Sequence, residues 1–282
     1  MQYHVSSNTK VAYLGPRGTW SDIASDLLAP GALKVPASSF AEVMEIAESG
    51  ATDSCVLPVE NSVEGPVTSA IDLMVDSKLK ITGEAMVPVR HMLLSNSEKI
   101  EKIYSHPQAI AQCRKTIKGL YPLAQIYEAS STAEMAQKIR QEAGSAIIGS
   151  DRISEIYGLK IKERDICDFP RNFTRFVILS GKNTPPTGKD KTSITFILGR
   201  NEAGSLVKAL LPFSKRGINL SMVMSRPDKF NPGSYRFFMD ALGHFLDDAM
   251  KSAITELSDQ CSSIRILGSY PASSWNVPRE EQ

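Results

Sequence analysis

The segment Asn172-Phe173-Thr174-Arg175-Phe176 sets a hydroxyl and a guanidinium side by side among apolar side chains. The two phenylalanines and the apolar residues 177–179 are typical of a buried strand. In such a strand a guanidinium needs an anion, and a hydroxyl needs a hydrogen-bond partner or a chemical role. The alternative is a strand edge where Thr174 is solvated and Arg175 forms a surface ion pair. Taken alone, the segment favours that alternative, so other polar motifs must decide.

A second polar group follows the apolar residues 54–59, which predict a strand. Glu60, Asn61 and Ser62 come at its carboxyl end, before a predicted helix over residues 66–75. Ligands of open α/β sheets bind at this end of the strands. A carboxylate, an amide and a hydroxyl there suit substrate binding and proton transfer. The alternative is that Asn61 and Ser62 only form a loop that caps the helix.

A third polar group follows the predicted strand 102–104. Ser105 and His106 open a helix through Cys113, on which Gln108 and Gln112 lie one turn apart and share a face. The simplest role of His106 is to cap this helix. No spacing in the chain matches a zinc protease or a Ser-His-Asp set.

A glycine-rich turn, Gly15 to Trp20, separates a predicted strand over residues 11–14 from a predicted helix over residues 22–28. Ser21 and Asp22 suit the N-cap of that helix. Because glycines allow the backbone to approach a ligand, the loop amides there could face an anion.

These loops belong to a strand, polar loop, helix pattern that repeats across residues 10–160. A helix over residues 40–49, strands over 124–127 and 145–148, and a capping box at Ser131–Glu134 before a helix to Arg140 complete it. The pattern predicts an α/β fold with a mostly parallel sheet. The polar segment 181–191, rich in proline and glycine and without periodicity, predicts a domain boundary.

The last ninety or so residues change to a βαββαβ order, the ferredoxin-like plan. The order is a strand from Thr192, a helix ending before Gly217, two strands, a second helix and a closing strand; the predicted elements are residues 192–198, 203–216, 218–225, 235–242, 245–257 and 263–268. Gly217 suits the residue that stops the first helix. Without an acid–base cluster, this domain indicates a binding module rather than a second active site.

Composition excludes several classes of function. The chain has 282 residues, 42% of them hydrophobic and 22% charged, and its apolar runs are far shorter than the roughly 18 residues of a membrane span. Met1 to Lys10 lacks the apolar core of a secretory signal, so we expect a cytoplasmic protein with reduced cysteines. Lysine and arginine number 32 and aspartate and glutamate 31, which leaves no field to attract nucleic acid.

Together the motifs resemble the monofunctional prephenate dehydratases over nearly the whole chain. The segments that carry the resemblance are Tyr13–Ser21, Pro58–Ser62, Ser105–Cys113 and Asn172–Phe176. The resemblance implies a catalytic domain at residues 1–183, built as two subdomains with a cleft like type 2 periplasmic binding proteins, and a linker at 184–191. It implies a carbon–oxygen lyase of phenylalanine biosynthesis that converts prephenate to phenylpyruvate, water and carbon dioxide without a metal or organic cofactor.

The resemblance also implies roles for single residues. Thr174 would donate its proton to the leaving hydroxyl, with Glu60 as a relay and Asn61 as a third catalytic residue. The implied substrate-binding residues are Ser21, Ser62, Ser105, Gln112, Arg175 and Phe176. Because successive strand side chains point to opposite faces, Thr174 and Arg175 need not both face the substrate. If Arg175 points away, the helix N-termini after the three serines would bind the carboxylates.

Residues 192–282 resemble an ACT regulatory domain, which implies feedback inhibition by L-phenylalanine bound across a subunit interface in a homodimer or homotetramer. The implied binding residues are Gly204, Ser205, Leu206, Val207, Asn219, Leu220, Ser225 and Arg226. Met224 stands where that family usually has a glutamate, which removes a carboxylate from the regulatory site. Trp20 stands where it usually has a phenylalanine and should serve as a packing residue.

Three rival functions remain open at this stage. Arogenate differs from prephenate by an ammonium in place of a ketone, so an arogenate dehydratase would have nearly the same sequence. A non-catalytic amino-acid sensor would have no reason to keep both the Asn172–Phe176 and the Glu60–Ser62 motifs. A transcription regulator would need a DNA-binding domain, and only about ten residues precede the first predicted strand.

Overall fold

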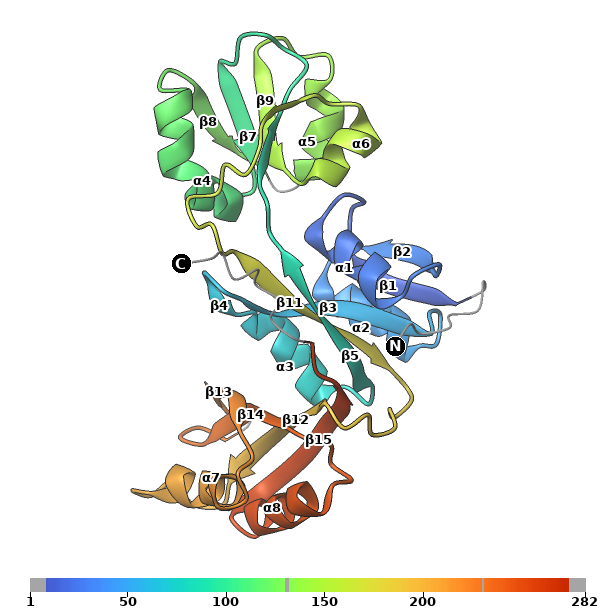
Figure 1. The fold of residues 1–282 in the computed structure, drawn as a ribbon, viewed down its shortest axis with the longest axis vertical. Helices are drawn as coiled ribbons and strands as arrows, with labels where there is room; N and C mark the ends of the chain where they lie inside the picture. The colour runs from blue at the N-terminus through green and yellow to red at the C-terminus, as the bar shows by residue number, and fades with distance from the viewer. Residues whose placement is uncertain (1–8, 130–131, 230, 274–282) are drawn as a thin grey trace. The chain divides into compact units, whose positions relative to one another are not determined.

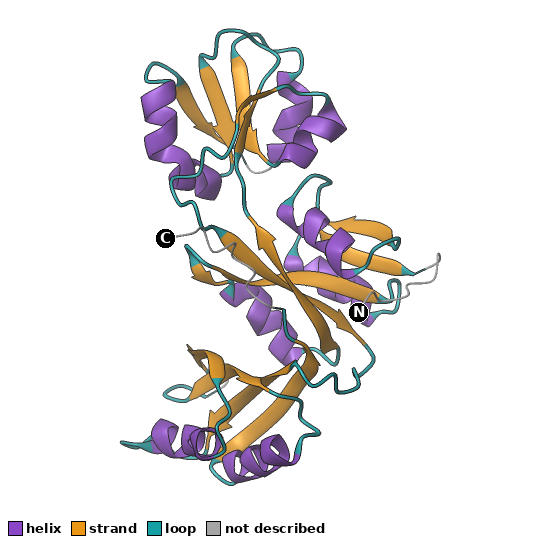
Figure 2. Ribbon diagram, viewed as in Figure 1, coloured by secondary structure: helices purple, strands orange, loops and turns teal. Residues whose placement is uncertain are grey.

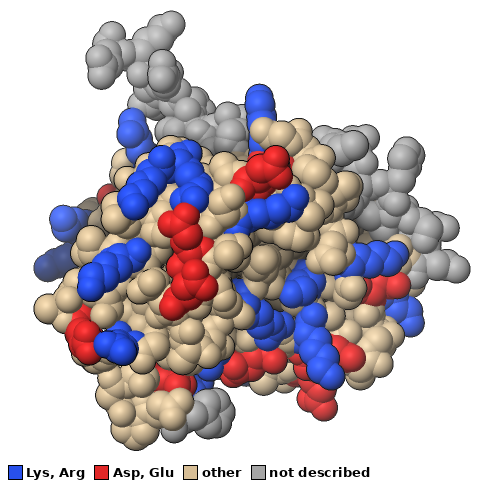
Figure 3. Space-filling model, turned by 90° about the horizontal axis from the view of Figure 1, so that it is seen from below, with Lys and Arg blue, Asp and Glu red and all other residues tan. Residues whose placement is uncertain are grey.

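The computed structural model describes residues 9–129, 132–229 and 231–273. The described residues divide into two compact units. The first comprises those up to Leu73 together with Ala85–Phe176, and the second comprises Met74–Glu84 together with those from Val177 onward. Within the described residues, no helix is both long and apolar enough to cross a membrane. On the face drawn in Figure 3, basic side chains lie among acidic ones rather than in a separate patch.

The first sheet has the strand order β2-β1-β3-β11-β5, with β4 paired to β3 (Figure 1). Its strands β1, β2 and β3 run parallel, and β4 is antiparallel to β3. The strands are β1 (Lys10–Leu14), β2 (Leu33–Ala37), β3 (Ser54–Asn61), β4 (Gly65–Pro66), β5 (Lys80–Pro88) and β11 (Phe173–Ser180), and the helices between them are α1 (Trp20–Leu28), α2 (Phe40–Glu48) and α3 (Thr68–Asp76). Because β3 lies next to β11, the two principal polar motifs of the sequence meet.

The second sheet has the order β10-β6-β9-β7-β8 and belongs to the first unit. Its strands are β6 (Met92–Leu94), β7 (Lys102–Ser105), β8 (Gln125–Glu128), β9 (Ser145–Gly149) and β10 (Ile161–Glu163), and its helices are α4 (Pro107–Leu120), α5 (Thr132–Ile139) and α6 (Asp151–Tyr157). Strands β8, β7 and β9 run parallel, and β6 runs antiparallel to both of its neighbours, β9 and β10.

Side-chain alternation along the second sheet gives it two apolar faces. Leu93 and Ile148 pack with residues of α4, whereas Leu94 and Ile147 pack with residues of α5 and α6. Figure 2 accordingly shows helices on both faces of this sheet. The strand period of two therefore explains why neighbouring residues of one strand lie in different cores.

The second unit folds as the predicted βαββαβ domain, with the antiparallel order β13-β14-β12-β15. Its elements are β12 (Asp190–Leu198), α7 (Ser205–Lys215), β13 (Leu220–Pro227), β14 (Tyr235–Leu242), α8 (Asp248–Ser258) and β15 (Cys261–Pro271). The expected α/β and ferredoxin-like classes are thus both found. In β15, Gly268 is required because a Cβ there would lie 2.1 Å from the carbonyl oxygen of Ile81.

Several predicted boundaries were wrong. Helix α1 begins at Trp20 with Thr19 as its N-cap, whose hydroxyl accepts from the Asp22 amide at 3.2 Å, so Ser21 and Asp22 do not cap it. Glu60 and Asn61 lie within β3 rather than after it. The capping box at Ser131 lies outside the described residues.

Strand β5 was not predicted, and β12 begins two residues before the expected Thr192. One buried ion pair joins β5 to the start of β12. The Nζ of Lys191 lies 2.9 and 3.0 Å from the two carboxylate oxygens of Glu84, whose side chain is completely buried. Each charge contradicts a strand pattern when read by itself, and only the paired charges are tolerated in the interior.

Candidate active site

Thr174 and Asn61 meet where the start of β11 lies beside the end of β3. Both side chains are buried, and the Asn61 Nδ2 donates to the Thr174 Oγ1 over 2.9 Å. The backbone holds the two strands in this register, since the Ser62 amide donates to the Phe173 carbonyl over 2.9 Å. The structure therefore joins two residues that the sequence placed in separate motifs.

The orientation of the Asn61 amide is fixed by the backbone that follows it. Its Oδ1 accepts from the amides of Val63 and Glu64, over 2.9 and 3.0 Å. Its Nδ2 therefore faces Thr174 and acts only as a donor. The Thr174 oxygen accepts this hydrogen bond, so its own proton is available for another acceptor. Within residues 9–129, 132–229 and 231–273, no protein acceptor for that proton is found.

Asn61 is also one member of a closed ring of four side chains and one backbone amide. Its Nδ2 donates to the Asn172 Oδ1 over 2.8 Å, and the Asn172 Nδ2 donates to the Gln112 Oε1 over 2.8 Å. The Gln112 Nε2 donates to the Glu64 carboxylate over 2.8 Å, and the Glu64 backbone amide returns to Asn61. All four hydrogen bonds run in one direction, so the bonds that share one amide side chain polarise each other.

His91 joins the ring from the side. Its Nε2 lies 3.0 Å from the Gln112 Oε1, and its ring makes an edge contact with Trp20 at a centroid distance of 6.0 Å. Burial lowers the pKa of His91, which favours the neutral ring at pH 7. Since the Gln112 oxygen accepts, Nε2 carries the hydrogen, and Nδ1 has no hydrogen-bond partner among the described residues. From the sequence alone, His91, Glu64 and Asn172 were assigned no role, although Asn172 lies in the motif of residues 172–176.

Several other residues implied by the resemblance do not contact Thr174. Within the described residues, no hydrogen bond joins Glu60 to Thr174, and strand alternation directs Glu60 and Asn61 to opposite faces of β3. The same alternation separates Arg175 from Thr174 on β11, where Arg175 is buried. Phe176, on the face of Thr174, is buried in the core.

Two of the three implied serines, Ser62 and Ser105, have hydrogen-bond partners within the protein. The Ser62 hydroxyl donates to the Arg171 carbonyl over 3.0 Å and accepts from the Phe173 amide over 2.9 Å, which holds the start of β11. The Ser105 hydroxyl donates to the Ile148 carbonyl over 2.9 Å. Ser21 is buried in the first turn of α1. The hydroxyls of Ser62 and Ser105 are thus engaged in hydrogen bonds with the backbone.

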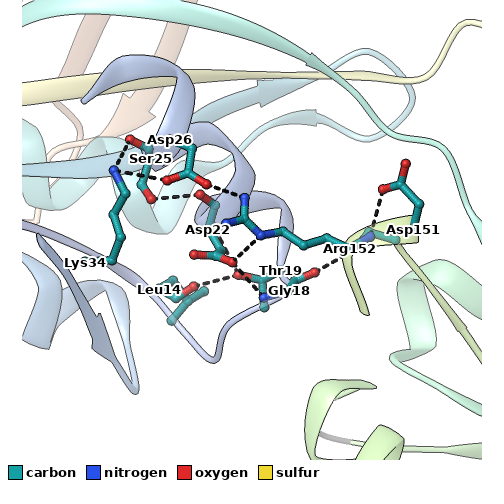
Figure 4. Close-up of polar contacts among 10 residues, drawn as sticks. Leu14, Gly18, Thr19, Asp22, Ser25, Asp26, Lys34, Asp151 and Arg152 are labelled. Carbon is teal, nitrogen blue, oxygen red and sulfur yellow. Dashed lines mark hydrogen bonds and ion pairs between the residues drawn. The ribbon is translucent and has the colours of Figure 1, made fainter. Parts of the chain in front are cut away.

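The glycine-rich turn binds an anion, but the anion is the protein's own carboxylate (Figure 4). The Gly18 amide donates to the Asp22 Oδ2 over 2.8 Å, and the same oxygen lies 3.1 Å from the Arg152 Nε. Arg152 also pairs with Asp26, and the Ser150 hydroxyl donates to the Gly18 carbonyl over 2.7 Å. The Gly18 amide is therefore occupied, contrary to the expectation of a substrate-facing loop.

Metal-ligand residues do not gather at this site. Among the residues that the structure describes, no group of three or more His, Cys, Asp or Glu side chains could hold a metal ion. The arrangement instead offers a buried hydroxyl that is polarised by an amide donor. Such a group can donate to a developing negative charge on a bound molecule.

Comparisons with known proteins show which family the chain resembles. The family model for prephenate dehydratase matches residues 11–184. A bifunctional chorismate mutase/prephenate dehydratase from Aquifex aeolicus is 38% identical over 266 residues, which cover 93% of this chain and 73% of that protein. An arogenate dehydratase/prephenate dehydratase 2 from Arabidopsis thaliana is 36% identical over 282 residues, covering 94% and 73%.

Two solved structures resemble the chain as a whole. A prephenate dehydratase from Arthrobacter aurescens in complex with L-Phe is 33% identical with a TM-score of 0.85, covering 94% of this chain and 90% of that one. GqqA, a quorum quenching acylase, is 30% identical with a TM-score of 0.84, covering 94% and 98%.

Proposed function

Because the chain belongs to the prephenate dehydratase family, we propose that the Thr174 hydroxyl, held by Asn61, is the acid of that family's reaction in this protein. The expected family, the α/β fold class and the assignment as a lyase are confirmed by the family match and by the related structures. The roles of individual residues, the oligomeric state and the cytoplasmic location remain proposals.

The reaction converts prephenate to phenylpyruvate, water and carbon dioxide. The bond between the ring and one carboxylate breaks to release carbon dioxide, and its electron pair enters the ring as the C–O bond breaks. The hydroxyl leaves as water with one proton that is ultimately supplied by solvent. Aromatisation drives the reaction, so the difficult step is the departure of the hydroxyl. A threonine hydroxyl is too weak an acid to ionise fully, and it acts by donating a hydrogen bond to the charge that develops on the leaving oxygen.

One observation carries the proposal: the Asn61 Nδ2 donates to the Thr174 Oγ1 over 2.9 Å. A hydroxyl that accepts a hydrogen bond becomes a better donor. Positioned acid catalysis typically contributes about 10²- to 10⁴-fold to the rate. Glu60 stays a proposal as a relay, without a contact to support it. Gln112 is a member of the ring, and we propose that it supports substrate binding indirectly, by holding its hydrogen-bond partners in place.

The substrate carboxylates require cationic or amide partners. We propose Arg175 for one of them, with the N-terminus of α4, next to Ser105, as a further donor. Strand alternation argues against Arg175 and Thr174 facing the same molecule, which favours the backbone amides. Each helix terminus contributes about 0.3 to 1 kcal/mol at an exposed site, so several would be needed.

A turnover assay tests the proposed function. The purified protein should form phenylpyruvate from prephenate, followed by its absorbance, without added metal or organic cofactor. A parallel incubation with arogenate, followed by phenylalanine formation, distinguishes the alternative named by the Arabidopsis relative. Turnover of arogenate but not of prephenate would identify arogenate as the substrate. Turnover of neither compound would favour a binding protein without catalytic activity.

The geometry of Thr174 does not suit a nucleophile for acyl transfer, the activity that the name of GqqA states. Acyl transfer by a hydroxyl requires a neighbouring base that removes its proton. The neighbour of the Thr174 oxygen is instead the amide donor of Asn61. Among the described residues, no base lies within hydrogen-bond distance of this hydroxyl.

We propose that the second unit binds L-phenylalanine, as the Arthrobacter relative binds L-Phe. Gly204, in the left-handed region with φ +84°, is the N-cap of α7 and leaves the first amides of that helix without a capping side chain. Val207 in the first turn of α7 is 69% exposed, and Asn219 and Ser225 at β13 are exposed. We further propose that Leu206, Leu220 and Arg226 complete the site and that a second copy covers it.

L-phenylalanine should release heat on binding, raise the melting temperature and inhibit prephenate turnover. Val207→Asp should abolish all three effects while leaving uninhibited turnover unchanged. Leu246→Asp, at another exposed apolar residue of the same unit, is the matched control. Met224→Glu restores the carboxylate usual in the family and should tighten binding. The absence of both heat and thermal shift in the wild type would contradict regulation by this amino acid.

A further inference from the structure

Glu64 contributes two groups to the ring of hydrogen bonds that includes Asn61. Its backbone amide donates to the Asn61 Oδ1 over 3.0 Å, and its carboxylate accepts from the Gln112 Nε2 over 2.8 Å. Glu64 lies in the turn between β3 and β4, whereas Gln112 lies on α4 of the second sheet. One exposed residue thus connects the catalytic asparagine to a distant helix of the same unit.

Of the four side chains in the ring, the Glu64 carboxylate is the only one that cannot exchange an acceptor for a donor. Each amide side chain of the ring can present either an oxygen or an NH₂ group, but an ionised carboxylate only accepts. Facing Glu64, Gln112 must present its NH₂ group, which leaves its oxygen for Asn172 and His91. Asn172 must then present its oxygen to Asn61. A reversed Gln112 would bring two NH₂ groups together and leave both without an acceptor.

We propose that Glu64 is a positioning residue whose carboxylate closes this ring and so aims the Asn61 amide at the Thr174 hydroxyl. This role rests on the proposed function of Thr174 as the acid. Asn61 keeps its backbone donor from Val63 when Glu64 changes, so loss of the carboxylate should loosen the aim rather than abolish it. A small misplacement of a catalytic group lowers the rate by as much as about 10²-fold.

The test is a series at position 64 with a kcat and KM for prephenate at each step. Glu64→Gln keeps an acceptor of the same length, Glu64→Ala removes it, and Glu64→Lys offers only donors and turns Gln112 around. We expect kcat to fall in that order, with about 10- to 100-fold lost in Glu64→Ala and more in Glu64→Lys, and KM to change by less than about threefold. Because Glu64 is exposed, all three variants should fold.

Glu45→Lys is the matched control, since Glu45 is an exposed glutamate on α2 of the same unit and undergoes the same charge change. If charge alone mattered, Glu64→Gln would match Glu64→Ala, and the proposal would fail. Equal and normal kcat in all three variants would also overturn it.

A second readout does not depend on turnover. In the ¹⁵N-labelled protein, the side-chain NH₂ signals of Asn172 and Gln112 should exchange slowly with solvent, and Glu64→Lys should speed that exchange while Glu45→Lys leaves it unchanged. Fast exchange in the wild type would contradict the ring itself. Slow exchange together with no turnover of prephenate would instead leave the ring in place and refute the proposed function.

Discussion

Replacement of Thr174 by alanine is expected to lower kcat for prephenate by at least about 100-fold, because the variant has no proton to donate to the leaving hydroxyl. Asn61 keeps two other acceptors, the Asn172 side chain and the Phe173 carbonyl, so stability should fall by no more than about 1 kcal/mol. Thr174→Ser retains the hydroxyl and should keep more activity than Thr174→Ala. Steady-state kinetics and urea unfolding measure both effects.

Thr192→Ala provides a control for the loss of a buried threonine hydroxyl, because Thr192 lies in β12 of the second unit. Its kcat should stay near that of the wild type. Near-normal turnover in Thr174→Ala would remove Thr174 from the mechanism, whatever its contacts.

Replacement of Asn61 by aspartate is expected to lower kcat by on the order of 10²- to 10³-fold, although the two side chains have the same shape. One carboxylate oxygen still accepts from the Val63 and Glu64 amides, but the other faces three oxygens. Thr174 would then donate its proton to the aspartate and no longer to the substrate. The loss of paired donors should also lower the free energy of unfolding by about 1 to 3 kcal/mol.

Asn61→Asp distinguishes a Thr174 hydroxyl that acts as a hydrogen-bond donor from one that needs a base, whereas Asn61→Ala does not. If Thr174 needed a base, the aspartate would supply one, and kcat would be maintained or increased. Asn96→Asp makes the same chemical change at an exposed asparagine and should leave kcat unchanged. An active Asn61→Asp variant would contradict the direction of the hydrogen bond to Thr174.

The fold class could be predicted from local sequence patterns, whereas the candidate site residues followed from the resemblance to a family. Alternating and helical periodicity predicted most strands and helices, whereas the direction of the Arg175 side chain on β11 was left open. Strand β5 was not predicted because Glu84 interrupts its apolar pattern. Lys191, the ion-pair partner of Glu84, lies 107 positions away in the sequence. A charge that is paired only in three dimensions cannot be recognised from its neighbours in the chain.

The ring around Asn61 could not be predicted for the same reason. Its links join Asn61 to Asn172 and Gln112 to Glu64, pairs separated by 111 and 48 positions. The roles expected for the serines also depend on partners that a sequence does not reveal. Ser62, for example, lies at a suggestive strand end, yet its hydroxyl is engaged with the backbone at residues 171 and 173.

The most direct test of the central claim compares the wild type with Thr174→Val, which exchanges only the hydroxyl for a methyl group. Prephenate binding, measured by calorimetry, should change by less than about threefold, because the shape of the site is kept. The rate of phenylpyruvate formation in a single turnover should fall by at least about 100-fold. A single-turnover rate near that of the wild type would show that the Thr174 hydroxyl is not the acid.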